Sequence, residues 1–141
     1  MNRRTFVGTL LGGGAAAYLA AVLYPLARFL VPPRLAEATT NSVVAAKVGE
    51  LRPNTGKIFA FGRQPALLVL TPQGEYRAFS AVCTHLQCTV QYRGDLQQIW
   101  CACHNGHYDL SGNVVSGPPP RPLSPYQVVV RGEEILVVRE S

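Results

Sequence analysis

Two short boxes of cysteine and histidine constrain this chain more than any other feature. The first is Cys83-Thr84-His85-Leu86-Gln87-Cys88, and the second is Cys101-Ala102-Cys103-His104. Together they contain all four cysteines and two of the three histidines in the sequence. A Cys-x-His followed by a Cys-x-x-His offers two thiolates and two imidazoles. That set suits an iron–sulfur cluster in which one iron takes two cysteines and the other takes two histidines.

Two other interpretations of the boxes stay open on the residues alone. Four cysteines in an exported domain can form two disulfides, which leaves the spacing of His85 and His104 as a coincidence. Two cysteines and two histidines can also bind zinc. A zinc site explains neither the remaining two cysteines nor the proline-rich segment Gly117-Pro118-Pro119-Pro120.

The boxes resemble those of the Rieske iron–sulfur proteins, specifically the membrane-anchored subunit of quinol:cytochrome c oxidoreductases. That subfamily reads Cys-Thr-His-Leu-Gly-Cys and Cys-Pro-Cys-His-Gly-Ser, and the resemblance runs from about Phe79 to Leu123. It implies a [2Fe-2S] cluster of the Rieske type, with four iron ligands: Cys83, His85, Cys101 and His104. It also implies that the two extra cysteines, Cys88 and Cys103, form a disulfide between the cluster loops.

Three further positions are interpreted from the same resemblance. Tyr108 matches a tyrosine whose hydroxyl bonds to the sulfur of a cysteine ligand. The segment Gly117-Pro118-Pro119-Pro120 matches the proline loop that covers the cluster. His107 lies three residues past His104, but the family does not use this position as a ligand. We therefore predict that His107 is a partly exposed loop residue.

The chain departs from the family at four positions without losing a ligand. Gln87 replaces a glycine, Ala102 replaces a proline, and Asn105 and Gly106 stand where the family has glycine and serine. The family serine donates a hydrogen bond to a bridging sulfide, and such bonds raise the reduction potential. Its absence at Gly106 implies a lower potential, which suits menaquinol better than ubiquinol.

The resemblance implies a redox subunit of a quinol-oxidising cytochrome bc-type complex. A quinol held by a cytochrome b subunit would hydrogen-bond to a cluster histidine, His104, with His85 as the second catalytic histidine. The electron would pass to a c-type cytochrome. The alternatives are the Rieske subunit of another exported oxidoreductase, such as an arsenite oxidase, and a soluble Rieske ferredoxin that feeds an oxygenase. Such ferredoxins lack an anchor and the extra cysteine pair.

An apolar run near the amino end predicts a membrane anchor. Thr5–Tyr24 is a run of 20 residues without charge, which is long enough to cross a bilayer as a helix. A signal peptide cleaved near Ala36-Glu37-Ala38 is the alternative, but the run exceeds the usual signal core. Arg3 and Arg4 resemble the start of a twin-arginine export signal, and by the positive-inside rule they also keep this end cytoplasmic.

The same features predict where the protein lies. A disulfide persists only in an oxidising compartment. We therefore predict a single-pass protein of the bacterial cytoplasmic membrane with a periplasmic head. The net charge of +5 belongs largely to residues 1–38, which carry four arginines against Glu37. The head is close to neutral, and we predict that it does not bind nucleic acid.

The rest of the chain predicts an all-β domain. We expect an anchor over residues 1–33, a flexible tether over 34–41 and a Rieske head over 42–141, in the form of a small antiparallel β-sandwich with the cluster loops at one end. Pro25, and then Pro32 and Pro33, are expected to end the anchor helix. Short β-rich runs between turn signals predict strands at Val43–Val48, Lys57–Phe61, Leu67–Thr71, Tyr76–Ser80, Gln98–Cys101, Tyr126–Arg131 and Ile135–Arg139.

Overall fold

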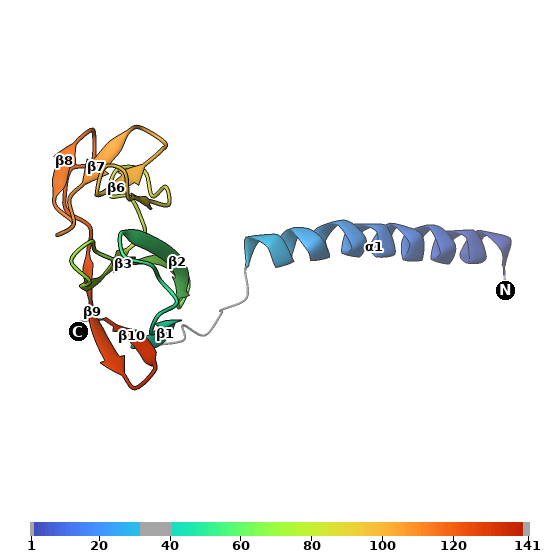
Figure 1. The fold of residues 1–141 in the computed structure, drawn as a ribbon. Helices are drawn as coiled ribbons and strands as arrows, with labels where there is room; N and C mark the ends of the chain where they lie inside the picture. The colour runs from blue at the N-terminus through green and yellow to red at the C-terminus, as the bar shows by residue number, and fades with distance from the viewer. Residues whose placement is uncertain (1, 32–40, 140–141) are drawn as a thin grey trace. The chain divides into compact units, whose positions relative to one another are not determined.

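The computed structural model of the protein describes residues 2–31 and 41–139. The chain divides into two compact units between residues 36 and 37, and each unit is described by itself. The first contains one helix, α1 (Arg3–Leu30), and the second contains ten strands (Figure 1). The predicted tether, residues 34–41, lies outside the described residues except for Asn41.

Helix α1 is long and apolar enough to cross a membrane. Its 28 residues have a mean hydropathy of 1.8 in the most apolar window, and none of that window is buried within the protein. At 1.5 Å per residue it is about 42 Å long. The prediction that Pro25 ends the helix is wrong, because α1 continues through Pro25 to Leu30. Proline removes only one backbone donor, and helices that cross membranes tolerate this loss.

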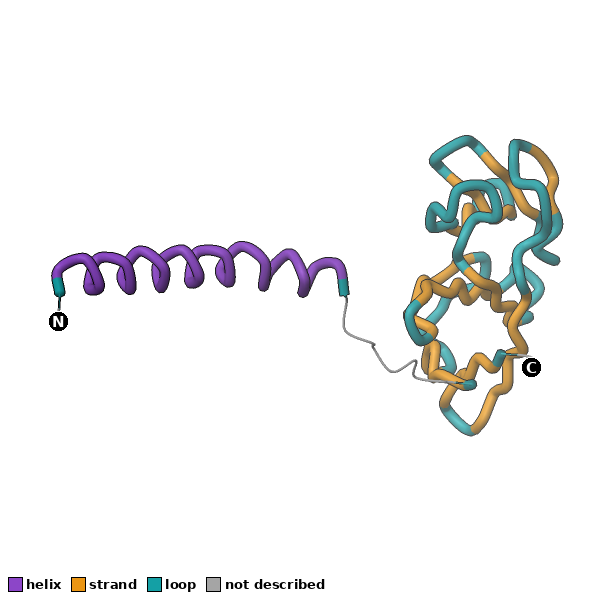
Figure 2. Tube along the Cα trace, turned by 180° about the vertical axis from the view of Figure 1, so that it is seen from behind, coloured by secondary structure: helices purple, strands orange, loops and turns teal. Residues whose placement is uncertain are grey.

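The larger sheet of the head contains six strands. They are β1 (Ser42–Lys47), β2 (Thr55–Phe61), β3 (Gln64–Leu70), β4 (Tyr76–Ser80), β9 (Pro125–Arg131) and β10 (Glu134–Val138). The order is β1-β10-β9-β4-β3-β2, and all neighbours are antiparallel. The edge strands β1 and β2 also contact each other, so the sheet curls into a near-barrel. Figure 2 shows it as a ring of strands.

The smaller sheet carries the two boxes. Its strands are β5 (Gln91–Arg93), β6 (Gln98–Cys101), β7 (Gly106–Tyr108) and β8 (Val114–Ser116), paired antiparallel in chain order. The first box lies in the connection from β4 to β5. The second forms the end of β6 and the turn into β7. Both boxes therefore lie in loops that rigid strands hold in place.

Strand β3 joins the two halves of the head because both of its faces are buried. Leu68 and Leu70 pack into the core of the near-barrel. Leu67 and Val69 pack into a second core that also contains Cys83. A fully buried Leu or Val side chain contributes roughly 1.5–3 kcal/mol. The apolar run of β3 thus fixes the box-bearing half onto the near-barrel.

The prediction of an all-β antiparallel head is confirmed. Each of the seven predicted strands is present, and two of them, Tyr76–Ser80 and Gln98–Cys101, have the predicted bounds. Three short strands, β5, β7 and β8, were not expected. They build most of the smaller sheet, so the support of the second box comes largely from elements that the sequence pattern did not predict.

Candidate metal centre

The first box folds into a tight turn that is closed by its own backbone. The N–H of Cys83 donates to the carbonyl of Cys88 at 2.8 Å, and the N–H of Gln87 donates to the carbonyl of Cys83 at 3.0 Å. Gln87 has a φ of 59°. This is the left-handed region that glycine adopts at least cost. The turn therefore keeps its shape with glutamine where the Rieske boxes have glycine.

The second box forms the turn between β6 and β7. Cys101 pairs with Gly106 across the two strands, so residues 102–105 make the connection. Asn105 closes it with a φ of 53°. Asparagine enters this region more readily than most residues, because its short polar side chain can bond locally.

A disulfide joins the two loops. Cys88 and Cys103 are bonded, with their Cα atoms 6.6 Å apart and 15 residues apart in the sequence. The predicted pairing is therefore confirmed. The remaining cysteines, Cys83 and Cys101, are free and buried. The interpretation that placed all four cysteines in two disulfides does not fit this arrangement.

The four predicted donors are arranged by depth. The Cys83 and Cys101 side chains are each 2% exposed. His85 is half-buried and His104 is exposed, with ring centroids 4.8 Å apart. The thiols thus lie inside the head and the imidazoles toward its surface.

One atom indicates that a ligand belongs between these residues. The Nδ1 atom of His85 is buried and has no hydrogen-bond partner, alone among the side-chain nitrogens and oxygens of the described residues. A buried polar atom without a partner is costly. An iron bound at Nδ1 would remove that cost, so this structure fits a cluster with a histidine-ligated iron.

The sulfur atoms of Cys88, Cys101 and Cys103 lie within 4.8 Å of one another. This proximity does not make a three-cysteine metal site, because two of the sulfurs belong to the disulfide. Iron binds thiolates, so Cys101 is the member of this group that can bind it. The disulfide lies directly beside that sulfur.

Tyr108 connects the first box to the rest of the site. Its buried hydroxyl lies 3.4 Å from the sulfur of Cys83 and accepts a hydrogen bond from the N–H of Thr84 at 3.2 Å. The hydroxyl of Thr84 donates to the carbonyl of Arg121 at 2.7 Å. The predicted contact between Tyr108 and a cysteine sulfur is thus present, and Thr84 adds a link to the segment after the proline loop.

The surroundings of the Cys83 and Cys101 thiols shift their pKa values in opposite directions. Burial alone would raise the pKa of the Cys83 thiol, but hydrogen bonds from Tyr108 and from the backbone N–H of His85 outweigh it and lower that pKa. Burial and the neighbouring Cys83 raise the pKa of Cys101. Burial, and then the hydrogen bond to Cys83, also raise the pKa of Tyr108. The Tyr108 hydroxyl therefore remains a proton donor near neutral pH.

The proline loop packs directly on the second box. A β-carbon on Gly106 would lie 2.7 Å from Cγ of Pro119, and one on Gly117 would lie 2.7 Å from Cα of Gly106. Gly117 also has a φ of 94°. Both glycines are therefore needed for the close approach of the two segments, and the absent hydroxyl at Gly106 has a steric reason in this chain.

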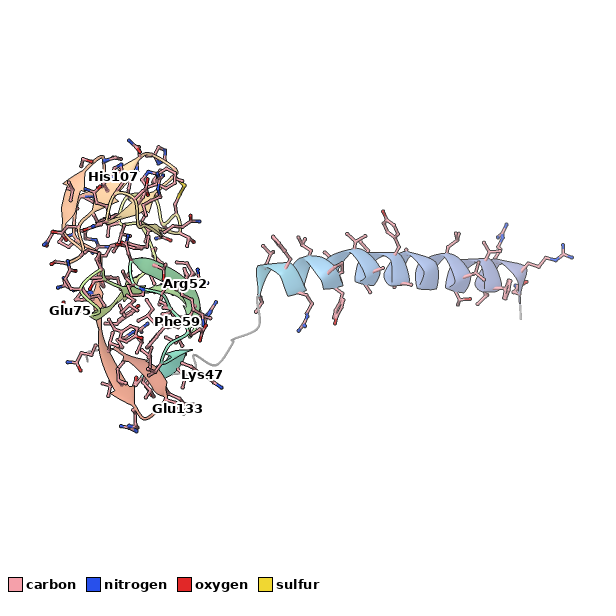
Figure 3. All side chains as sticks on the ribbon, in the orientation of Figure 1. Lys47, Arg52, Phe59, Glu75, His107 and Glu133 are labelled. Atoms are coloured by element: carbon pink, nitrogen blue, oxygen red, sulfur yellow. A yellow bond between two sulfur atoms is a disulfide. The ribbon has the colours of Figure 1, made fainter. Side chains whose placement is uncertain are left out.

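His107 lies in strand β7 rather than in a loop, which corrects that part of the prediction. Figure 3 labels it in the half of the head that carries the smaller sheet. Its Nδ1 lies 2.9 Å from Oε1 of Gln98, and its Nε2 lies 3.2 Å from Oδ1 of Asn105. Both ring nitrogens contact side-chain amides, which agrees with a residue that is not a ligand.

Together, the fold and the donors define a small all-β domain whose loops carry cysteine and histidine side chains that could hold a metal centre. A family model for the Rieske [2Fe-2S] domain matches residues 41–128. The cytochrome b6-f complex iron-sulfur subunit of Chlorobaculum thiosulfatiphilum is 33% identical over 136 residues, covering 96% of this chain and 75% of the relative.

Two solved structures are similar to this chain and agree with the match to the Rieske domain. The plasma membrane Rieske protein from Synechocystis PCC 6803 is 30% identical with a TM-score of 0.53, over 57% of this chain and 82% of the other. The ferredoxin of carbazole 1,9a-dioxygenase from Nocardioides aromaticivorans IC177 is 26% identical with a TM-score of 0.60, over 71% and 99% of the two chains.

The chain belongs to the Rieske iron–sulfur proteins, in the family of the iron–sulfur subunits of cytochrome bc-type complexes. Its cofactor is a Rieske-type [2Fe-2S] cluster, and it is a redox subunit that transfers electrons. Sequence reasoning missed the contact of Gly106 with Pro119 and the side-chain contacts of Trp100 and Asn105. Asn105 in place of a family glycine was the available signal.

Proposed function

We propose that Cys83 and Cys101 bind one iron of the cluster and that His85 and His104 bind the other. The partnerless Nδ1 of His85 is the observation that carries this assignment. Support also comes from the two free, buried thiols and from the disulfide, which removes Cys88 and Cys103 as competing ligands.

Single substitutions test the ligand set. Each of the four residues is replaced with Ala, and the low-temperature EPR spectrum of the reduced protein is recorded. We expect every variant to lose the Rieske signal, whereas His107→Ala should keep a Rieske signal, if a broader one, because the hydrogen bonds of its ring join it to the side chains of Gln98 and Asn105. A normal signal in any one of the four variants would remove that residue from the set.

We propose that the chain takes an electron and a proton from a quinol at the exposed end of this site. When bound, a Rieske cluster supplies a one-electron acceptor that makes its histidine ligands more basic on reduction. His104 is exposed, so its ring can accept a hydrogen bond from a substrate hydroxyl and then hold the proton. Leu86 is 63% exposed beside His85 and offers an apolar contact for a quinol ring or its binding site.

The partners follow from the same proposal. The quinol would be held by a cytochrome b subunit, and the electron would pass on to a c-type cytochrome. Relatives named as cytochrome b6-f complex subunits support this assignment, as does a helix long and apolar enough to anchor the chain. We place the protein in the bacterial cytoplasmic membrane with its head on the periplasmic side, where the disulfide persists.

Menaquinol is the quinol that this chain favours. Gly106 lacks a hydroxyl that could donate to a cluster sulfur, and such a donor stabilises the reduced form more than the oxidised form. The absence of the donor lowers the reduction potential, which suits a quinol of low potential. The contact between Gly106 and Pro119 leaves no room for a larger side chain without movement of the proline loop.

Purification of the intact complex tests the function. We expect a cytochrome b subunit to co-purify, and reduction of a c-type cytochrome to proceed faster with a menaquinol analogue than with a ubiquinol analogue. The His104→Ala complex should contain the same subunits and oxidise neither quinol. Co-purification with an arsenite-oxidising subunit, with cytochrome reduction driven by arsenite, would replace the quinol proposal.

A further inference from the structure

The smaller sheet has a second face that the proposed function does not use. Ile99, Cys101 and Tyr108 are buried on its core face. Trp100 pairs with His107 across β6 and β7. Because side chains alternate along a strand, Trp100 and His107 lie on the opposite, outer face.

Three hydrogen-bond contacts link the side chains on this face. The indole Nε1 of Trp100 donates to Oδ1 of Asn105 at 2.9 Å. The same oxygen lies 3.2 Å from Nε2 of His107, and Nδ1 of His107 lies 2.9 Å from Oε1 of Gln98. We call Trp100, Asn105 and His107 the clasp, since one amide oxygen is held between two rings.

The tryptophan of the clasp is itself held in place. The guanidinium of Arg93 lies 5.3 Å from the centre of the Trp100 ring, a distance at which a cation is attracted to the ring face. Asp95 fixes Arg93 through two contacts, at 2.8 Å to Nε and at 2.6 Å to Nη2. The hydrogen-bond donor of the clasp therefore has a restricted position.

The held residue follows His104 directly in the chain. Asn105 has a φ of 53°, and a change of that angle would turn the preceding residue relative to β7. Asn105 is exposed as a whole, although its carbonyl oxygen lies close to Gly117 of the proline loop. The bonds to its side chain add a second restraint, from the opposite strand face.

We propose that Asn105, held by Trp100 and His107, is a positioning residue that sets the direction of the His104 ring toward the cluster. The inference rests on the proposed ligand role of His104. Glycine, which the Rieske boxes carry at this position, allows the same φ but has no side chain to hold. The clasp is therefore a device of this chain's own residues.

Two variants and a control test the clasp in the full-length, cluster-loaded protein. Trp100→Phe removes the indole donor and keeps an aromatic ring under Arg93. Asn105→Gly removes the acceptor and keeps the backbone conformation accessible. Tyr92→Phe is the matched control, because it removes a side-chain hydrogen bond, 2.6 Å to Oδ1 of Asn54, away from this turn.

We expect hydrogen exchange at the backbone amides of residues 104–106 to become about fivefold faster in Trp100→Phe, as for the loss of one neutral hydrogen bond. It should become at least that much faster in Asn105→Gly, which also removes the contact with His107. The EPR lines of the reduced protein should broaden as the His104 ring samples more orientations. The double variant should exchange no faster than Asn105→Gly alone, since that change already removes the bond that Trp100→Phe removes. Tyr92→Phe should match the parent in both measurements.

Parent-like exchange and EPR lines in both single variants would overturn the clasp, even if their melting temperatures fall. Additive effects in the double variant would also overturn it, because they would mean that Trp100 and Asn105 act separately. A parent protein with no Rieske signal is a different outcome, which would refute the ligand assignment itself.

Discussion

Gln87 occupies a backbone conformation that its β-carbon makes unfavourable. Its φ is 59°, and this region costs an ordinary residue roughly 1–2 kcal/mol. Gln87→Gly should relieve that cost, offset in part by the greater freedom of glycine in the unfolded chain, with a net gain of roughly 0.5–1 kcal/mol. Thermal unfolding of the loaded protein measures the effect.

The same substitution at Gln91 is the control. Gln91 is an exposed residue of strand β5, where glycine is expected to destabilise by roughly 0.5–1 kcal/mol. Opposite signs at the two positions would support the conformational argument. A loss of stability at both positions would mean that the Gln87 side chain makes a contribution larger than its backbone cost.

Tyr108 is the residue through which the fold acts on a cysteine sulfur. Tyr108→Phe removes the hydroxyl that lies 3.4 Å from Sγ of Cys83. We expect the reduction potential to fall by roughly 40 mV, since a hydrogen bond contributes about 1 kcal/mol and a tenfold change in equilibrium is about 59 mV for one electron. Protein-film voltammetry measures it. An unchanged potential would mean that the Tyr108 hydroxyl bonds to Thr84 and does not donate a hydrogen bond to the sulfur of Cys83.

At the scale of elements, the contact between strand β7 and the proline loop controls what position 106 can hold. Gly106→Ala and Gly106→Ser would each place a β-carbon 2.7 Å from Pro119, so both should displace the loop to a similar degree. Only serine adds a donor. We therefore expect the serine variant to have the higher reduction potential of the two, as measured by voltammetry.

The alanine variant is the reference for this comparison, because it has the same steric effect without the hydroxyl. Equal potentials in the two variants would contradict the argument that the missing donor lowers the potential, and the menaquinol assignment would lose its support. Pro119→Ala, combined with each change, should restore room for the loop and preserve the difference.

The disulfide is a second link between elements. Replacement of Cys88 and Cys103 together by serine opens a loop of about 15 residues, for which chain entropy predicts a loss of roughly 3 kcal/mol. Denaturant unfolding of the loaded protein should show a lower midpoint, and the cluster should be lost sooner on storage. Reduction of the parent protein should reproduce both effects. An unchanged midpoint would mean that iron ligation alone holds the loops together.

Most of the strands could be predicted from the sequence, and the three that were missed are the shortest ones. β4 and β6 matched because they are β-rich runs followed by recognisable loops. β5, β7 and β8 have three residues each, too few for an alternating pattern to appear. β7 begins inside the second box at Gly106, and it forms a strand because β6 and β8 pair with it on either side.

Part of the site could be predicted because it lies in short, local patterns. The donors and the disulfide lie within short boxes whose spacing is visible in one dimension. The clasp joins β6 to the turn after it, and Gly106 meets Pro119 only because the chain returns after β8. Such contacts depend on packing between segments, which no local pattern specifies. Asn105 and Gly106 were visible as departures, and their roles required the three-dimensional structure.

At the scale of the whole molecule, the proposed function would require a head that reaches two partners from one anchor. We propose that residues 34–41, which lie outside the described residues except for Asn41, act as the tether. Insertion of three prolines there should stiffen it and slow quinol oxidation by the complex, because a domain that moves between partners needs a hinge. The EPR spectrum of the cluster should stay unchanged. Normal turnover with the prolines in place would refute the requirement for a hinge.

Strand β1 also determines how the head bears mechanical load. It is the first strand after the anchor, its Ser42 pairs with Val138 of β10, and the carbonyl of Asn41 accepts a hydrogen bond from the N–H of Arg139 at 3.0 Å. A pull along β1 would be shared by all of its bonds to β10 at once, whereas a pull across it would open them singly, starting from the bond between Asn41 and Arg139. The head would therefore be mechanically anisotropic, because the force that ruptures it would depend on the direction of the pull at its amino end.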